Sequence, residues 1–129
     1  MTAKAPRLVC AEPQLFSADV AASCAFYASR LGFSVRFLHG QPPFYGQVER
    51  GGARLNIRHI DAGRPVPSDP REPDLLAASI VVEGIEALFE EFSSKGVAFH
   101  SPLRTEMWGA RTFIVADPDG NLVLFAGER

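Results

Sequence analysis

The stretch WGARTFIVADPDGNLVLF at positions 108–125 contains the pattern that decides the fold. Two apolar runs, 112–116 and 122–125, stand on either side of the sequence DPDGN at 117–121. Proline presets φ for a turn and glycine can take a positive φ, so these five residues predict a tight connection between two strands. We interpret DPDGN as a structural turn that closes a hairpin.

Upstream of the hairpin, the same half of the chain predicts a strand, a helix and another strand. Apolar side chains recur there at the helical spacing of three and four residues: Ile85, Leu88, Phe89 and Phe92. Gly96 ends this helix, and strand candidates lie at 77–83 before it and at 96–99 after it. The second half of the chain therefore predicts the order β-α-β-β-β.

The first half of the chain repeats this order. One helical face is predicted from residues spaced three and four apart: Val20, Ser23, Cys24, Tyr27 and Leu31. Asp19 is the expected N-cap of this helix, and Gly32 follows its end. Strands are predicted in the following ranges: 8–16 before the helix, then 32–37, 44–49 and 53–59 after it. The two helix-ending glycines lie almost half a chain length apart, which indicates a repeated unit.

The repeat predicts an α+β fold with two βαβββ modules, whose curved mixed sheets surround a cleft. We expect one domain over residues 1–129, with module one at about 7–60 and module two at about 75–127. The segment between them, about 61–74, is rich in proline and reads as a linker. Each module is too small to be secure alone, so each needs the other or a second chain to cover its sheet.

Charge and hydropathy exclude several classes of partner. Thirteen Lys and Arg against fifteen Asp and Glu give a net charge of -2, without the basic excess that nucleic acid requires. The longest nearly apolar stretch, 75–82, is too short for a membrane span, and residues 1–7 lack an apolar export segment. We therefore expect no nucleic acid, no membrane and a cytoplasmic location. Cys10 and Cys24 have no metal or redox spacing, so both are expected to be buried small apolar side chains.

Two runs of sequence resemble signatures of the vicinal oxygen chelate superfamily, the glyoxalase/bleomycin resistance protein/dioxygenase family. The first runs from SADV at 17–20 through FY at 26–27 to LGF at 31–33, and the second is 108–121. Paired βαβββ modules are the architecture of that superfamily. The resemblance covers nearly the whole chain and implies the same fold.

Within that superfamily the chain is most similar to bleomycin-resistance and related antibiotic-binding proteins. The similarity lies in AEP at 11–13, VEGIE at 82–86, WG at 108–109 and DP at 117–118. It implies a homodimer that holds a small organic ligand in clefts between subunits. It also implies that the first strand crosses to the partner near Pro13.

The resemblance also locates the positions where enzymes of the superfamily hold a divalent metal: Glu12, Asn56, Ala77 and Leu124. Only the first is a good ligand, the asparagine is a weak neutral donor, and the last two cannot coordinate a metal. His39, His59 and His100 have no pair at strand or helix spacing. We therefore expect no metal and no cofactor.

The cleft is expected to be polar and non-chelating. If Leu55 and Ile57 face the helix, strand alternation turns Asn56 and Arg58 toward the cleft. The residues predicted to bind a ligand are Glu12, Gln14, Phe44, Tyr45, Asn56, Arg58, Ser79 and Trp108. The alternative for the polar members is a solvated sheet face, with a simple ion pair between Glu12 and Arg58. For Trp108 the alternative is a core position.

These observations favour a non-enzymatic protein that binds or sequesters an antibiotic-like small molecule. The alternative is an enzyme of the superfamily. It would be a metal-dependent lyase or dioxygenase, or a metal-free enzyme in which Glu12 acts as a general base.

Overall fold

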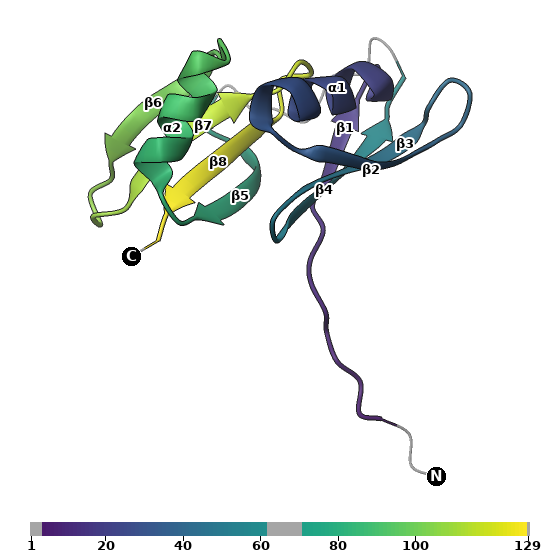
Figure 1. Ribbon diagram of the computed structural model, residues 1–129, viewed down its shortest axis with the longest axis horizontal. Coiled ribbons are helices and arrows are strands. Elements are labelled where there is room, and N and C mark those ends of the chain that lie inside the picture. Colours follow the sequence, from purple (N-terminus) through teal and green to yellow (C-terminus); the bar gives the residue numbers. More distant parts are fainter. Residues whose placement is uncertain (1–3, 62–70, 129) are drawn as a thin grey trace.

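The computed structural model describes residues 4–61 and 71–128, which form two four-stranded sheets with one helix on each (Figure 1). Module one contains β1 (Gln14–Ser17), α1 (Val20–Leu31), β2 (Ser34–His39), β3 (Tyr45–Arg50) and β4 (Ala53–His59). Module two contains β5 (Leu76–Val82), α2 (Ile85–Ser94), β6 (Phe99–Thr105), β7 (Arg111–Ala116) and β8 (Leu122–Gly127). The predicted α+β fold with two βαβββ modules is confirmed.

Both sheets have the same topology. The strand orders are β1-β4-β3-β2 and β5-β8-β7-β6, with β1 parallel to β4, β5 parallel to β8, and every other pair antiparallel. Most of the predicted linker, residues 62–70, lies outside the described residues. No helix in the described part of the chain is long and apolar enough to cross a membrane.

Helix α1 is capped and buried as its sequence predicts. The Asp19 side chain accepts a hydrogen bond from the backbone N of Ala22 at 3.0 Å, and Gly32 ends the helix with a φ of 73°. The five residues predicted to share one face are all buried: Val20, Ser23, Cys24, Tyr27 and Leu31. They pack against β2, β3 and β4, where Leu55 and Ile57 face the helix.

The core of module two is built from aromatic rings. Five phenylalanines pack with neighbouring centroids 4.6 to 5.7 Å apart: Phe89, Phe92, Phe99, Phe113 and Phe125. Phe113 contacts all four of the others, so it lies at the centre of this cluster. Edge-to-face and offset ring pairs stabilise the fold beyond what burial of the rings alone contributes, so this cluster holds α2 on its sheet.

The first strand is shorter than predicted. β1 begins at Gln14, Glu12 and Pro13 still contact Asn56 of β4, and residues 4–11 leave the body as an extended arm (Figure 1). Leu8 and Val9 on this arm are 99% and 78% exposed. The strand prediction for 8–13 is wrong for the isolated chain, because β4 reaches only the carbonyl of Pro13, which accepts from the backbone N of Asn56 at 3.0 Å, and no described strand pairs with residues 8–12. For the same reason Cys10 is exposed rather than buried.

Cys24 is buried, as expected. Burial raises the pKa of its thiol to about 11, so the thiol stays protonated and unreactive at neutral pH.

The predicted turn at 117–121 also joins the two modules. The Tyr27 hydroxyl of α1 donates a hydrogen bond to Asp117 Oδ2 at 2.9 Å. Asn121 Nδ2 donates to the same oxygen and to the backbone carbonyl of Phe16, each at 2.9 Å. These contacts connect residues about 90 to 105 positions apart, so the turn locks module two to the start of module one.

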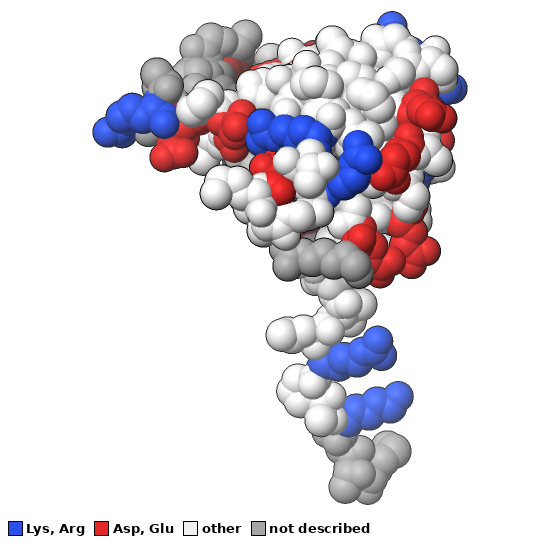
Figure 2. All heavy atoms as spheres, turned by 90° about the vertical axis from the view of Figure 1, so that its left-hand side faces the viewer, with Lys and Arg blue, Asp and Glu red and all other residues white. Residues whose placement is uncertain are grey.

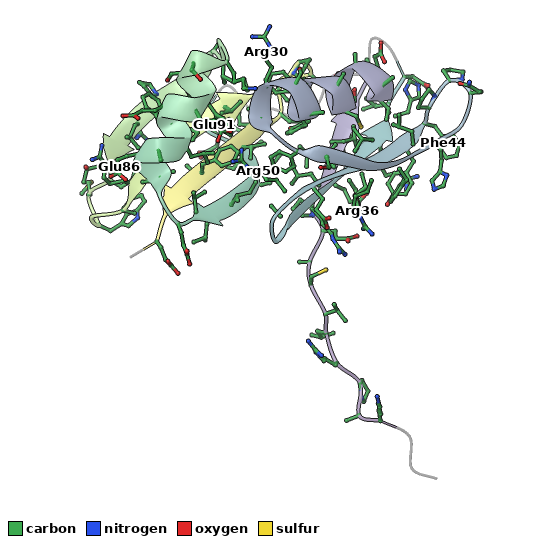
Figure 3. All side chains as sticks on the ribbon, viewed as in Figure 1. Arg30, Arg36, Phe44, Arg50, Glu86 and Glu91 are labelled. Atoms are coloured by element: carbon green, nitrogen blue, oxygen red, sulfur yellow. The ribbon has the colours of Figure 1, made fainter. Side chains whose placement is uncertain are left out.

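An ion pair provides a second connection between the modules. Arg50 at the end of β3 binds Glu91 of α2 through Nη1 and Nη2, at 2.7 and 3.1 Å (Figure 3). Arg50 also donates to the carbonyl of Leu31 at the end of α1. The hydrogen bond from Arg50 lowers the pKa of the Glu91 carboxyl, although partial burial acts in the opposite direction.

Glu91→Gln is expected to cost about 0.5–1 kcal/mol of unfolding free energy at pH 7, because both partners are more than a third exposed. A lowered folded-state pKa gives stability that is present above the unfolded pKa and is lost as the pH falls through the folded pKa. The cost should therefore be smaller at pH 3 than at pH 7. Urea denaturation at both pH values measures it. Glu90→Gln, at an exposed neighbouring position, should stay within about 0.5 kcal/mol of wild type, and an unchanged cost at pH 3 would contradict the assignment.

Candidate functional site

One face of the module-one sheet is left open. Helix α1 covers the opposite face, and no other described element lies across this one (Figure 1). The register of β3 and β4 places Tyr45 beside Arg58, Gln47 beside Asn56 and Glu49 beside Arg54. We call this surface the open face. Its side chains are Glu12, Gln14, Phe16, Arg36, Phe37, His39, Tyr45, Gln47, Glu49, Arg54, Asn56 and Arg58.

The centre of the open face is a chain of hydrogen bonds. Arg36 Nη1 donates to Gln47 Oε1 at 2.5 Å, and Gln47 Nε2 donates to Asn56 Oδ1 at 2.7 Å. Asn56 Nδ2 in turn donates to Glu12 Oε1 at 3.4 Å. Gln47 and Asn56 are only 3% and 2% exposed. Since each amide uses its oxygen and its nitrogen within the chain, their orientations are fixed before any ligand arrives.

The charged groups beside this chain are paired with each other. Arg54 Nε donates to Glu49 Oε2 at 2.5 Å, and Arg54 Nη1 lies 3.7 Å from Glu12 Oε2. The hydrogen bond from Arg54 lowers the pKa of the Glu49 carboxyl. The alternative of an ion pair between Glu12 and Arg58 is wrong: Glu12 pairs with Arg54, and Arg58, four residues further along β4, has its guanidinium over the Tyr45 ring.

Aromatic rings occupy the end of the open face nearest the β2–β3 hairpin. The centroids of Phe37 and His39 are 4.9 Å apart, and Tyr45 lies 5.2 and 6.2 Å from them. The guanidinium carbon of Arg58 is 5.0 Å from the centroid of the Tyr45 ring. We call these four residues the aromatic end. It offers flat apolar surface next to a cation.

Two predicted residues lie in hollows away from the open face. Ser79 lines a groove of about 920 Å³ between the modules, together with Pro13 at the base of the arm and Arg54 at its border with the open face. Trp108 is 64% exposed and lines a separate hollow of about 570 Å³ at the start of α2. Glu83 on the rim of that hollow is one of three glutamates there, and Figure 2 shows acidic side chains gathered on one side of this end of the molecule.

The structure thus brings together five of the eight predicted residues. Glu12, Gln14, Tyr45, Asn56 and Arg58 share the open face. Phe44 is 54% exposed on the β2–β3 hairpin (Figure 3), where its backbone N donates to the carbonyl of His39 at 2.8 Å. The remaining two, in the hollows described above, do not reach this face within one chain.

Seven residues of the open face were not predicted: Phe16, Arg36, Phe37, His39, Gln47, Glu49 and Arg54. For two of them, Gln47 and Glu49, a signal existed in the sequence. The Gly51-Gly52 turn pairs Arg50 with Ala53, and counting back from that pair places Gln47 beside Asn56. Strand alternation then assigns Tyr45, Gln47 and Glu49 to one face.

The positions that correspond to the family's metal ligands do not form a chelating set. Glu12 and Asn56 are adjacent, but the carboxylate is held by Arg54 and the amide oxygen accepts from Gln47. Ala77 on β5 has no donor atom. In residues 4–61 and 71–128 no group of three or more His, Cys, Asp or Glu side chains is arranged to hold a metal ion.

Comparison with known proteins relates this arrangement to a family. A model of the Glyoxalase/Bleomycin resistance protein/Dioxygenase superfamily matches residues 9–125. A bleomycin resistance protein from Geobacillus stearothermophilus is 26% identical over 123 residues, covering 88% of this chain and 92% of that protein. Another with the same name and the same identity comes from Staphylococcus aureus.

Solved structures agree with the sequence match. The bleomycin-binding protein from bleomycin-producing Streptomyces verticillus, complexed with copper(II)-bleomycin, has a TM-score of 0.75 and 28% identity, covering 97% of this chain and 100% of that chain. A glyoxalase-related enzyme from Clostridium phytofermentans has the same TM-score at 18% identity, covering 98% and 100%. The fold alone therefore does not separate a binder from an enzyme. The chain belongs to the glyoxalase/bleomycin resistance protein/dioxygenase superfamily.

Proposed function

We propose that this protein binds and sequesters a small, antibiotic-like organic molecule without transforming it. The observation that carries the proposal is the pairing on the open face. Its carboxylates are paired with arginine and its central amides bind each other, whereas the rings of its aromatic end are half-buried or exposed. Such a surface offers a ligand aromatic rings to stack on and polar side chains held in fixed orientations. It presents neither a chelating set nor an unpaired carboxylate that could act as a base.

The relatives support a binding function. The Streptomyces verticillus structure is described as a bleomycin-binding protein in complex with copper(II)-bleomycin, and two bacterial relatives are named bleomycin resistance proteins. Those names and the open face point to the same class of activity.

The proposed form is a homodimer with a cleft between subunits. Among the described residues of one chain nothing forms a wall opposite the open face, and the hollow beside Trp108 is separate from this face. A second copy that places its module two over the open face would complete an enclosed site. The arm supports this arrangement, because Leu8 and Val9 are apolar, fully or largely exposed and ready to pair with another chain near Pro13.

A binding screen combined with metal analysis tests the proposal. Copper(II)-bleomycin and planar aromatic compounds should include at least one ligand that stabilises the protein by about 2.7 kcal/mol at a hundredfold excess over Kd. The ligand should be recovered chemically unchanged, as judged by mass spectrometry. Protein purified without chelator should contain less than stoichiometric zinc, nickel, manganese or iron. A stoichiometric metal accompanied by conversion of the compound would contradict the proposal.

A further inference from the structure

The open face carries an unpaired positive charge at its aromatic end. Arg36 lies 3.9 Å from the Glu49 carboxylate, and Arg54 pairs with Glu49 and Glu12. Arg58 differs from both. Among the described residues no carboxylate lies within ion-pair distance of it, and its guanidinium lies over the Tyr45 ring. The charge of Arg58 is therefore available to a ligand.

Rings surround this charge on both neighbouring strands. Arg58 of β4 is beside Tyr45 of β3 and beside Phe16 of β1, which is 36% exposed. Phe37 extends the apolar surface toward the hairpin. A guanidinium over a ring keeps its N–H edge free, so it can donate to an anion while its plane remains stacked.

We propose that the ligand of this face is a planar aromatic molecule that bears a carboxylate, which Arg58 binds while the ring stacks on the aromatic end. This inference rests on the proposed function and specifies its ligand class. A guanidinium fits a carboxylate through two parallel hydrogen bonds, which neutral groups cannot reproduce. A cationic ligand would meet Arg58 without compensation, because Glu12 and Glu49 are already paired with arginines.

Three probes of one shape separate charge from stacking: 2-naphthoate, the neutral 2-naphthamide and the cationic 2-naphthylmethylammonium. Titration by calorimetry should show 2-naphthoate binding about 10–100-fold more tightly than the amide, as expected for a charge-assisted pair. The cation should bind more weakly than the amide. Amide chemical shifts should change at Tyr45, Phe37 and the neighbouring strands.

The variant Arg58→Gln should lose the preference for 2-naphthoate over 2-naphthamide while keeping weak binding of both. Arg58 is exposed, so its replacement should leave the melting temperature almost unchanged. Lys95→Gln removes one positive charge at an exposed position on the turn after α2, and it should bind all three probes as wild type does.

Three results would overturn the inference. The amide could bind as tightly as 2-naphthoate, Arg58→Gln could retain the preference, or the cation could bind best with shifts confined to the acidic hollow at Trp108. If none of the three probes binds but copper(II)-bleomycin does, this inference fails and the proposed function stands. If no compound of either screen binds, both fail.

Discussion

Asp117→Ala is expected to lower the free energy of unfolding by about 3–5 kcal/mol. Asp117 is 6% exposed and accepts four hydrogen bonds. Oδ1 accepts from the backbone N of Asp119 and Asn121, and Oδ2 accepts from the Tyr27 hydroxyl and from Asn121 Nδ2, each at 2.9 Å. Without the carboxylate, the Tyr27 hydroxyl and the backbone N of Asn121 lose this acceptor in a buried site, and Asn121 Nδ2 keeps only the carbonyl of Phe16. Urea denaturation followed by circular dichroism measures the loss.

Two further single substitutions test whether the lost hydrogen bonds of Asp117 cause this destabilisation. Tyr27→Phe removes one of the four hydrogen bonds and should cost about 1–2 kcal/mol. Glu90→Ala, on the exposed side of α2, should stay within about 0.5 kcal/mol of wild type. If Asp117→Ala costs less than about 1 kcal/mol, the turn does not hold the modules together.

Burial raises the pKa of Asp117, while hydrogen bonds from Asn121 and Tyr27 act against that rise. Burial and the nearby Asp117 charge also raise the pKa of Tyr27 well above its usual value. The sequence identified 117–121 as a turn, because proline and glycine preferences are local. It could not show that the turn binds α1, because that contact joins residues 90 positions apart.

The same difference between local and long-range information explains which residues of the open face could be predicted from the sequence. The β3–β4 pairing follows from the Gly51-Gly52 turn, which sets the register within a few residues. On β2, strict alternation from Val35, which pairs with Val48, would turn Phe37 toward the helix. The register shifts between Val35 and Phe37, so Phe37 pairs with Gln47 and lies on the open face. A single bulged residue reverses every later side chain, and no pattern in the sequence indicated it.

The placement of the two modules was also beyond the sequence. The ligand-binding prediction combined Asn56 of module one with Ser79 and Trp108 of module two. Their separation in one chain depends on contacts such as Arg50 with Glu91, which single-sequence periodicity does not encode. The repeat predicted which faces each module would leave uncovered, but not which surfaces would meet.

The double substitution Leu8→Glu and Val9→Glu is expected to dissociate the proposed homodimer. In the isolated chain these side chains are 99% and 78% exposed, so the change should leave the fold of the monomer intact. In a strand-exchanged dimer each copy buries both, so four apolar side chains at about 1.5 kcal/mol or more contribute about 6 kcal/mol. That corresponds to a dimer Kd about 10⁴-fold weaker. Light scattering after size exclusion should show one 14.0 kDa chain instead of twice that mass.

Arg7→Gln, in the same arm but polar before and after the change, is the matched control and should remain dimeric. A difference between the double variant and Arg7→Gln would show that the dimer depends on burial of the two apolar side chains and not on any change in the arm. If the double variant stays a dimer, the arm does not pair with a second chain.

A monomeric wild type would show that the open face must bind its ligand without an opposite wall. In that case only small probes such as 2-naphthoate should bind, and a glycopeptide that needs a cleft should not. If the double variant is a monomer and has lost ligand affinity together with dimerisation, then the second subunit supplies part of the site.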